Sequence, residues 1–309
     1  MISILRIGNS NARRYILNLV SLIPILFSQP LLANERCVAT GQWTDPATLQ
    51  SVEEQTVLAK MKDNPIILLG EHHQNPYHHA WHLDQLQLMK ENLSDFEIAL
   101  EMLPVKSQPV IDQWLRDEIS DEVFIDKSGW NTYWNHDVNL YLPMLKFAKE
   151  NRIPLHAINI SKQLFKDVSM NGWDAIPEGK REGVTTPGAA TRAYLVQLAR
   201  SFRRHGTPSG KGVTEEEGAR FKRFTEVQLL WDRAMAEGIS RVRLQAHAPV
   251  VVAIMGSGHM MHGFGTPQQL KDKGLAKFLI LVPWDDHLDC EEIKPGFADV
   301  IYGSPYSLD

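Results

Sequence analysis

Short apolar runs alternate along the chain with longer stretches in which apolar positions recur every three or four residues. A short run bounded by Gly or polar residues is typical of a strand covered on both faces, and the longer period is typical of an amphipathic helix. Predicted strands lie at residues 66–69, 96–101, 154–159, 250–255 and 277–282, with an edge strand at 299–302. Predicted helices lie at residues 46–61, 76–93, 107–119, 140–151, 190–202, 214–236 and 267–272. This alternation predicts an α/β fold, with a mostly parallel sheet flanked by helices.

The composition changes between residues 170 and 212, where Gly, Thr, Pro and Arg dominate. A capping box, Thr-Glu-Glu-Glu at residues 214–217, then starts the long helix. We expect the part at about 170–240 to be a helical insertion or lid within a single α/β domain that spans residues 34–309.

The N-terminal residues have the pattern of an export signal. Arginines precede a short apolar core at residues 15–27, and Ala33 offers a cleavage point. We therefore expect a secretory signal peptide at residues 1–33 and an exported, periplasmic protein, with an uncleaved anchor as the alternative. Cys37 follows Asn-Glu-Arg rather than the small, apolar run of a lipoprotein signal, so a lipid anchor is not supported.

Composition and cysteine content narrow the class of protein further. The 309 residues are 43% hydrophobic and 22% charged, with a formal net charge of −5. This composition lacks the basic excess of a nucleic-acid-binding protein. The two cysteines, Cys37 and Cys290, are compatible with one disulfide in an oxidising compartment, although their spacing alone does not establish it.

Candidate chemistry follows the predicted strands. Five of the twelve histidines lie between residues 66 and 82. Glu71 and His73 follow the first strand, Glu101 ends the second, and His259 follows the strand at 250–255. Because the carboxyl ends of parallel strands share one edge of the sheet, we expect these four side chains to converge. They are suitable ligands for Mn, Zn or Fe, and a water bound to such a metal is a nucleophile. Without a metal, a Glu–His pair can still deprotonate water.

Other polar residues lie on apolar helix faces and are open to two interpretations. His79 and His82 continue the apolar face of the helix at 76–93, either as core histidines bonded to the backbone or as part of the site. Tyr141 lies on the apolar face of the helix at 140–151, and its periodicity favours a core position.

Several familiar motifs are absent. The chain has no His-Glu-x-x-His zinc motif. Gly256-x-Gly258 is not a dinucleotide fingerprint, because Met261 stands in the place of the third glycine. Ser257 is not in a nucleophile elbow, which needs a residue between the serine and each glycine.

The residues Leu69-Gly70-Glu71-His72-His73-Gln74-Asn75-Pro76, followed by His78-His79, resemble the opening motif of the ChaN-like haem-binding proteins. Later blocks agree in order over most of the mature chain. They are Trp130 with Trp134, Tyr141-x-Pro143, Ala157-x-Asn159, Phe224-x-x-x-Gln228-x-x-Trp231-Asp232-x-x-Met235-Ala236, Gly256-x-Gly258-His259 and Ala298-Asp299.

This resemblance implies an exported haem-binding protein of bacterial iron acquisition, with haem at the interface of a homodimer and an outer-membrane haem or iron receptor system as partner. It also implies a tyrosine as the iron ligand, with histidine assisting from nearby. The candidates are Tyr133, Tyr141 and Tyr77, with His78 and His79. Many members carry a lipoprotein cysteine after the signal, and this sequence departs from that pattern.

The ChaN-like proteins are similar in turn to the Tiki metalloproteases and the erythromycin esterases. In this sequence, Gly70-Glu71-His72-His73 resembles their Gly-x-x-His motif, and Glu101 and His259 resemble their further Glu and His residues. The alternative function is therefore a metal-dependent Glu/His hydrolase, which explains the convergence of these side chains where haem binding does not. A structural or interaction module is the third interpretation.

Overall fold

The structure is a computed structural model that describes residues 37–93, 95–205, 214–245 and 250–306. The strands are β1 Trp43–Thr44, β2 Ser51–Val52, β3 Ile66–Glu71, β4 Phe96–Pro104, β5 Leu155–Asn159, β6 Val250–Gly256, β7 Leu279–Asp285 and β8 Val300–Ser304. The α-helices are α1 Glu54–Asp63, α2 Pro76–Asn92, α3 Gln108–Leu115, α4 Asp121–Ser128, α5 Trp130–Tyr133, α6 Val138–Glu150, α7 Lys162–Asn171, α8 Arg192–His205, α9 Glu215–Gln245 and α10 Thr266–Asp272.

The described strands form one eight-stranded sheet in the order β2-β1-β8-β7-β3-β6-β4-β5. The six strands from β8 to β5 run parallel, and β1 pairs antiparallel with both β8 and β2. The predicted α/β fold with a mostly parallel sheet is therefore confirmed. β3 lies in the middle of the parallel part, between β7 and β6, so its C-terminal end is central to one edge of the sheet.

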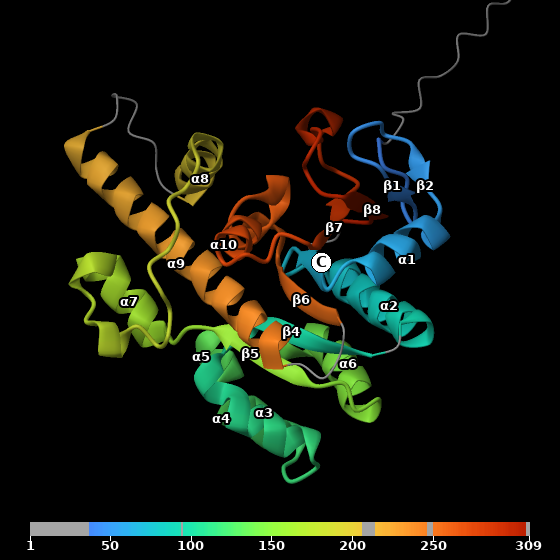
Figure 1. Cartoon of the computed structure of the whole chain (residues 1–309), viewed down its shortest axis with the longest axis horizontal. Coiled ribbons are helices and arrows are strands. Elements are labelled where there is room, and N and C mark those ends of the chain that lie inside the picture. The colour runs from blue at the N-terminus through green and yellow to red at the C-terminus, as the bar shows by residue number, and fades with distance from the viewer. Residues whose placement is uncertain (1–36, 94, 206–213, 246–249, 307–309) are drawn as a thin grey trace, which may run out of the picture. The chain divides into compact units, whose positions relative to one another are not determined.

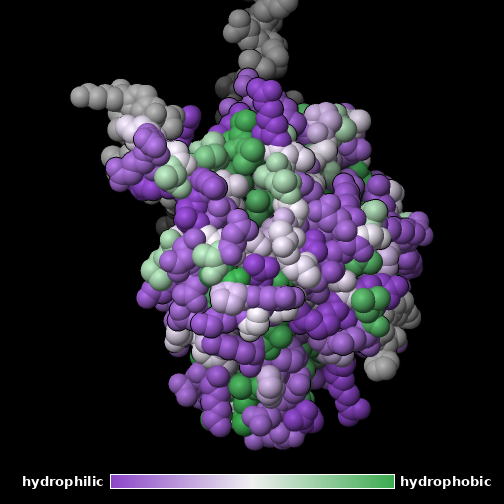
Figure 2. Space-filling model, turned by 60° about the vertical axis from the view of Figure 1, so that its left-hand side comes forward, coloured by the Kyte–Doolittle hydropathy of each residue, from purple (hydrophilic) through white to green (hydrophobic). Residues whose placement is uncertain are grey.

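Helices cover both faces of the sheet (Figure 1). On one face, Ile67 and Leu69 of β3 pack with buried residues of α1, α2, α3, α4 and α6. On the other face, Ile66 and Leu68 pack with buried residues of α9 and α10. This alternation explains why the strand sequence is apolar without interruption, because both faces are buried. On the side of the molecule drawn in Figure 2, hydrophobic residues form small separate groups among polar ones.

The loop from β3 to α2 is fixed by the residues that the sequence singled out. The Asn75 side chain accepts a hydrogen bond from the Tyr77 backbone N–H, and Pro76 occupies the first helical position. Asn75 Nδ2 also donates to Asp285 at the end of β7, at 2.6 Å. The cap thereby ties the start of α2 to the same edge of the sheet.

Three element predictions need correction. The helix expected at 46–61 begins only at Glu54, because the Asp45 carboxylate accepts from two backbone N–H groups in a turn and Leu49 adopts a φ of 58°. The edge strand expected at 299–302 is internal, because β1 pairs with it. The segment at 129–136, where the sequence predicted neither a helix nor a strand, contains α5, which starts after the left-handed Gly129.

A disulfide joins the first described residue to the segment between β7 and β8. Cys37 and Cys290 form a disulfide, with Cα atoms 5.6 Å apart. Between β5 and β6 the described chain forms α7, α8 and α9. Among the helices of the described residues, none is both long enough and apolar enough to cross a membrane. The expected signal peptide at 1–33 lies outside the described residues.

Candidate functional site

A cavity of about 640 Å³ opens beside the C-terminal ends of β4 and β5. Its apolar lining includes Trp134, Phe165 and Trp231, and the Phe165 and Trp231 rings stack with their centroids 4.8 Å apart. Its polar lining includes His73 and His259. Concave sites with apolar walls and a few polar groups are typical of small-molecule binding.

The first polar cluster at this cavity, the His259 group, consists of Glu101, Asp232, His259 and Tyr194. His259 Nδ1 lies 2.8 Å from Asp232 Oδ1, and its Nε2 lies 3.5 Å from Glu101 Oε1. The Tyr194 hydroxyl donates to the other Asp232 oxygen at 2.6 Å. Burial alone would lower the pKa of His259, but the charges of Glu101 and Asp232 raise it to about 9. This imidazole therefore carries a proton at neutral pH.

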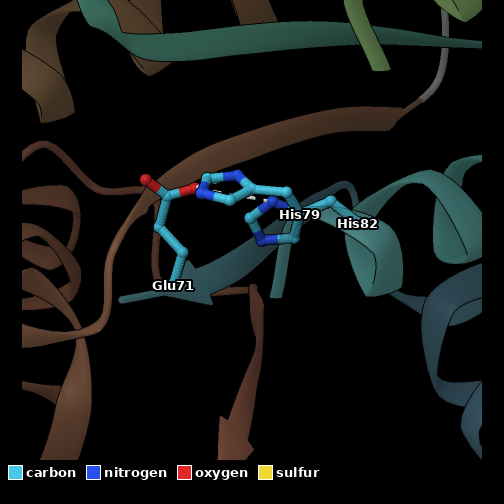
Figure 3. A group of neighbouring side chains, drawn as sticks. All are labelled: Glu71, His79 and His82. Carbon is cyan, nitrogen blue, oxygen red and sulfur yellow. Dashed lines mark ion pairs between the residues drawn. The ribbon is translucent and has the colours of Figure 1, made fainter. Parts of the chain in front are cut away.

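The second cluster, the Glu71 group, lies behind the cavity and consists of Glu71, His73, His79, His82 and Tyr141. Glu71 Oε1 accepts from the Tyr141 hydroxyl at 2.7 Å and lies 2.7 Å from His73 Nδ1. Glu71 Oε2 faces His82 Nδ1 at 3.5 Å and His79 Nδ1 at 3.6 Å (Figure 3). All of these side chains except His73 are buried.

The two clusters differ in charge because of their composition. Burial would raise the pKa of Glu71, but the hydrogen bond from His73 and the neighbouring imidazoles lower it to about 2. Burial lowers the pKa of His79, and it lowers that of His82 to about 4, against the attraction of Glu71. His73 is only partly buried, and although this burial alone would lower its pKa, its hydrogen bond to Glu71 and the charges of Glu101 and Glu71 raise it.

A glycine lets the two clusters approach each other. Gly256 ends β6 in register with Glu71 of β3, and its N–H donates to Glu101 Oε2 at 2.7 Å. A Cβ atom at this position would lie 2.8 Å from His73 Cε1. Only glycine leaves room there for the imidazole. The four side chains that were expected to converge at strand ends, Glu71, His73, Glu101 and His259, do lie around this point.

The matching family is described as haem-binding uptake, Tiki superfamily, ChaN, and its model covers residues 57–270. The chain belongs to this family. ChaN of Campylobacter jejuni, solved with cofacially bound haem, has 19% sequence identity and a TM-score of 0.65, over 84% of this chain and 95% of that one. An erythromycin esterase has 11% identity and a TM-score of 0.45, over 79% of this chain and 77% of the other. No curated protein matches the chain in sequence. The family match supports haem binding, and the likeness to the Campylobacter jejuni protein shows the same fold.

The three candidate tyrosines of this ChaN family member have different surroundings. Tyr133 lines the cavity, and the Lys106 ammonium lies 4.6 Å from its ring centroid. Tyr141 is fully buried in the core, as its periodicity favours, and its hydroxyl is engaged with Glu71. Burial and the Glu71 charge raise the pKa of Tyr141 far above its ordinary value. Tyr77 is exposed in the first turn of α2 and is not among the residues that line the cavity.

Neither candidate histidine of α2 lines the cavity. His78 accepts from the His72 backbone N–H through Nδ1, and its Nε2 lies 2.8 Å from Asp285. Both of its ring nitrogens are therefore engaged in holding the β3–α2 loop. His79 Nε2 lies 3.0 Å from the His73 carbonyl, and its Nδ1 faces Glu71.

Possible metal ligands are grouped differently from the expected set of Glu71, His73, Glu101 and His259. Among the described residues, the group whose ligand atoms lie within 4.8 Å of one another is Glu71, His79 and His82. The His73 imidazole is turned toward Glu71 Oε1 and the cavity. The expected residues therefore adjoin one another without forming one close ligand set.

Sequence reasoning missed several residues of the site. Asp232 and Tyr194 form the far side of the His259 group, and Asp232 was noted only within a matching block. The sequence feature that could have identified Asp232 is its position as an acidic residue beside the apolar face of the long predicted helix. His136 and two lysines one helical turn apart, Lys162 and Lys166, also line the cavity.

Proposed function

We propose that this protein is an exported haem-binding protein of bacterial iron acquisition, and that Tyr133 is its iron ligand. The observation that carries the proposal is one cavity in which Tyr133 adjoins the aromatic wall of Trp134, Phe165 and Trp231. A tyrosine is one of the protein groups that hold haem iron, and a flat apolar wall suits the porphyrin. Bound haem would supply the iron that the protein carries.

The charges around the cavity suit this ligand. Lys162 and Lys166 lie one helical turn apart on α7 and line the cavity, where they can pair with the two propionates of haem. The Lys106 ammonium, 4.6 Å from the Tyr133 ring centroid, adds a positive charge beside the proposed ligand. His73 and His136, whose rings lie 5.1 Å apart, can assist from the same cavity.

Tyr141 is the weaker candidate for the ligand. Its hydroxyl is buried and donates to Glu71. Iron binding would break this hydrogen bond and would place a negatively charged phenolate beside the Glu71 carboxylate, and both changes are unfavourable. Tyr77, His78 and His79 lie away from the cavity lining. We therefore assign the ligand to Tyr133 and a structural role to Tyr141.

We further propose that haem binds at the interface of a homodimer and that the protein works with an outer-membrane haem or iron receptor system. The related Campylobacter jejuni protein binds haem cofacially, and two copies of this chain could hold two stacked haems between them. Export to the periplasm is supported by the Cys37–Cys290 disulfide, because such bonds persist in oxidising compartments. A cysteine in a disulfide cannot also carry a lipid, which argues against a lipoprotein anchor at Cys37.

A haem titration of the purified protein tests the ligand assignment. We expect a saturable Soret band in the wild type, and an affinity weaker by at least about tenfold in Tyr133→Phe. Tyr77→Phe and Tyr141→Phe are the matched controls and should keep the wild-type affinity. An affinity that falls in Tyr141→Phe and not in Tyr133→Phe would overturn the assignment.

A metal-dependent hydrolase is the second candidate, favoured by the position of His259 between Glu101 and Asp232 on the cavity wall. Such an arrangement can donate and accept protons beside a bound substrate. The test is turnover of a p-nitrophenyl ester after loading with Mn, Zn or Fe. The hydrolase account requires turnover that His259→Ala or His73→Ala abolishes, together with no saturable haem binding.

A further inference from the structure

The Glu71 group contains three atoms that point at one another without a hydrogen bond. They are Glu71 Oε2, His79 Nδ1 and His82 Nδ1, each fully buried and without a hydrogen-bond partner among the described residues. Figure 3 shows the carboxylate, which rises from the end of β3, facing the two imidazoles from the start of α2. A buried polar atom left without a partner costs about 1–3 kcal/mol, so three in one place call for an explanation.

The second nitrogen of each imidazole fixes which nitrogen carries the proton. His79 Nε2 lies 3.0 Å from the His73 carbonyl oxygen, and His82 Nε2 lies 3.0 Å from the Gly70 carbonyl oxygen. A carbonyl only accepts, so both Nε2 atoms must be the N–H donors. In the neutral imidazole the remaining Nδ1 then carries a lone pair. Three electron-rich atoms therefore face one another, with no proton of their own to share.

The geometry of the three atoms matches a metal site. A tetrahedral zinc ion with ligands at about 2.0–2.2 Å places neighbouring ligand atoms about 3.3–3.6 Å apart. The two measured N–O separations are 3.5 Å and 3.6 Å, and all three atoms lie within 4.8 Å of one another. Two imidazoles and one carboxylate are also the protein ligands of many catalytic zinc sites.

Neighbouring hydrogen-bonding groups orient these three side chains, as the groups around a metal site orient its ligands. Each imidazole donates its other N–H to a backbone carbonyl, which fixes its orientation. The Tyr141 hydroxyl donates to Glu71 Oε1 and so leaves Oε2 turned toward the imidazoles. The ligand atoms are thus already positioned.

We propose that Glu71, His79 and His82 form a binding site for one divalent transition-metal ion of the zinc class, behind the wall of the cavity. The site is distinct from the one expected at Glu71, His73, Glu101 and His259, with which it shares only Glu71. It does not rest on haem binding, because Tyr133 and the aromatic wall take no part in it.

The test is the zinc content of the full chain after chelator treatment and reloading with one equivalent of Zn²⁺. We expect one tightly held zinc per chain, and an affinity weaker by more than about 100-fold in His79→Gln and in His82→Gln. His156→Gln is the matched control, since His156 also pairs with a glutamate, Glu97, at 2.6 Å but on β5. This variant should keep its zinc.

Two results would overturn the proposal. The first is a wild type that retains no zinc, which would mean that a proton or a water molecule satisfies the three atoms. The second is a loss of zinc in His73→Gln or His259→Gln together with its retention in His82→Gln. This result would show that the zinc site lies at the cavity wall. If the variants of His79 and His82 fail to fold, zinc retained by folded His73→Gln and His259→Gln supports the proposal, and zinc lost by either contradicts it.

Discussion

The Glu71 group and the His259 group are built from the same residue types in opposite proportions. In the first, one carboxylate faces three imidazoles, those of His73, His79 and His82. In the second, one imidazole lies between two carboxylates, those of Glu101 and Asp232. In each, a buried tyrosine hydroxyl donates to a carboxylate.

The ratio of carboxylates to imidazoles sets the charge of the buried histidine in each cluster. With two carboxylates near it, His259 has a pKa raised to about 9 and holds a positive charge. With one carboxylate shared among three imidazoles, the buried His82 has a pKa lowered to about 4 and is neutral. Burial acts in the same direction on both imidazoles, so the difference comes from the partners. A neutral, buried pair of imidazoles is suited to a metal ion, and a protonated imidazole at a cavity is suited to proton transfer.

The largest effect is expected on removing the one carboxylate of the Glu71 group. Glu71→Gln removes the carboxylate that faces the His73, His79 and His82 imidazoles. Breaking a buried ion pair in this way lowers the free energy of unfolding by about 3–5 kcal/mol. Denaturant unfolding at pH 7 measures it. The control is Glu118→Gln, which breaks a solvent-exposed pair with Arg116 and should leave the unfolding free energy almost unchanged. Equal costs for the two variants would contradict the comparison.

A somewhat smaller effect is expected from pH at the His259 group. Because the folded pKa of His259 is raised from 6.5 to about 9, its stabilisation is complete below pH 6.5 and is lost as the pH rises through 9. The shift corresponds to about 3 kcal/mol between these limits. Unfolding measured from pH 6 to pH 10 should show this loss, and Asp232→Asn should reduce its size. A variant with the wild-type slope would show that Asp232 does not hold the proton on His259.

The smallest effect is expected from the tyrosines. Tyr141→Phe and Tyr194→Phe each remove one hydrogen bond to a buried carboxylate, which costs about 1.5–3 kcal/mol. Thermal unfolding of both variants should give similar losses. If Tyr194→Phe alone has no effect, the two clusters are not alike in this respect, and the Asp232 carboxylate is satisfied without its tyrosine.

The sequence predicted the parallel sheet well, because uninterrupted apolar runs such as that of β6 occur where both faces are buried, but it ended β4 at Glu101, whereas the strand continues to Pro104. It also located Glu71, His73, Glu101 and His259, since parallel strands bring their ends to one edge. It could not predict that β1 covers β8, because two residues have no periodicity. It could not supply Asp232 either, since only the packing of α9 brings that residue to His259.

The orientations of side chains were also beyond the sequence. The apolar face of α2 placed His79 and His82 in the core, but only the carbonyls of Gly70 and His73 determine which nitrogens face Glu71. Likewise, periodicity favoured a core position for Tyr141, but no local pattern placed Tyr133, eight positions earlier, at a cavity. Their different burial follows from the left-handed turn at Gly129, which starts α5 beside the cavity.

Resonance Raman spectroscopy of the ferric haem complex tests most directly whether Tyr133 holds haem iron in the cavity. The account predicts the vibrational modes of an iron-bound phenolate in the wild type and in Tyr141→Phe, and their loss in Tyr133→Phe. A spectrum of haem held only by histidines, or phenolate modes that persist in Tyr133→Phe, would contradict it.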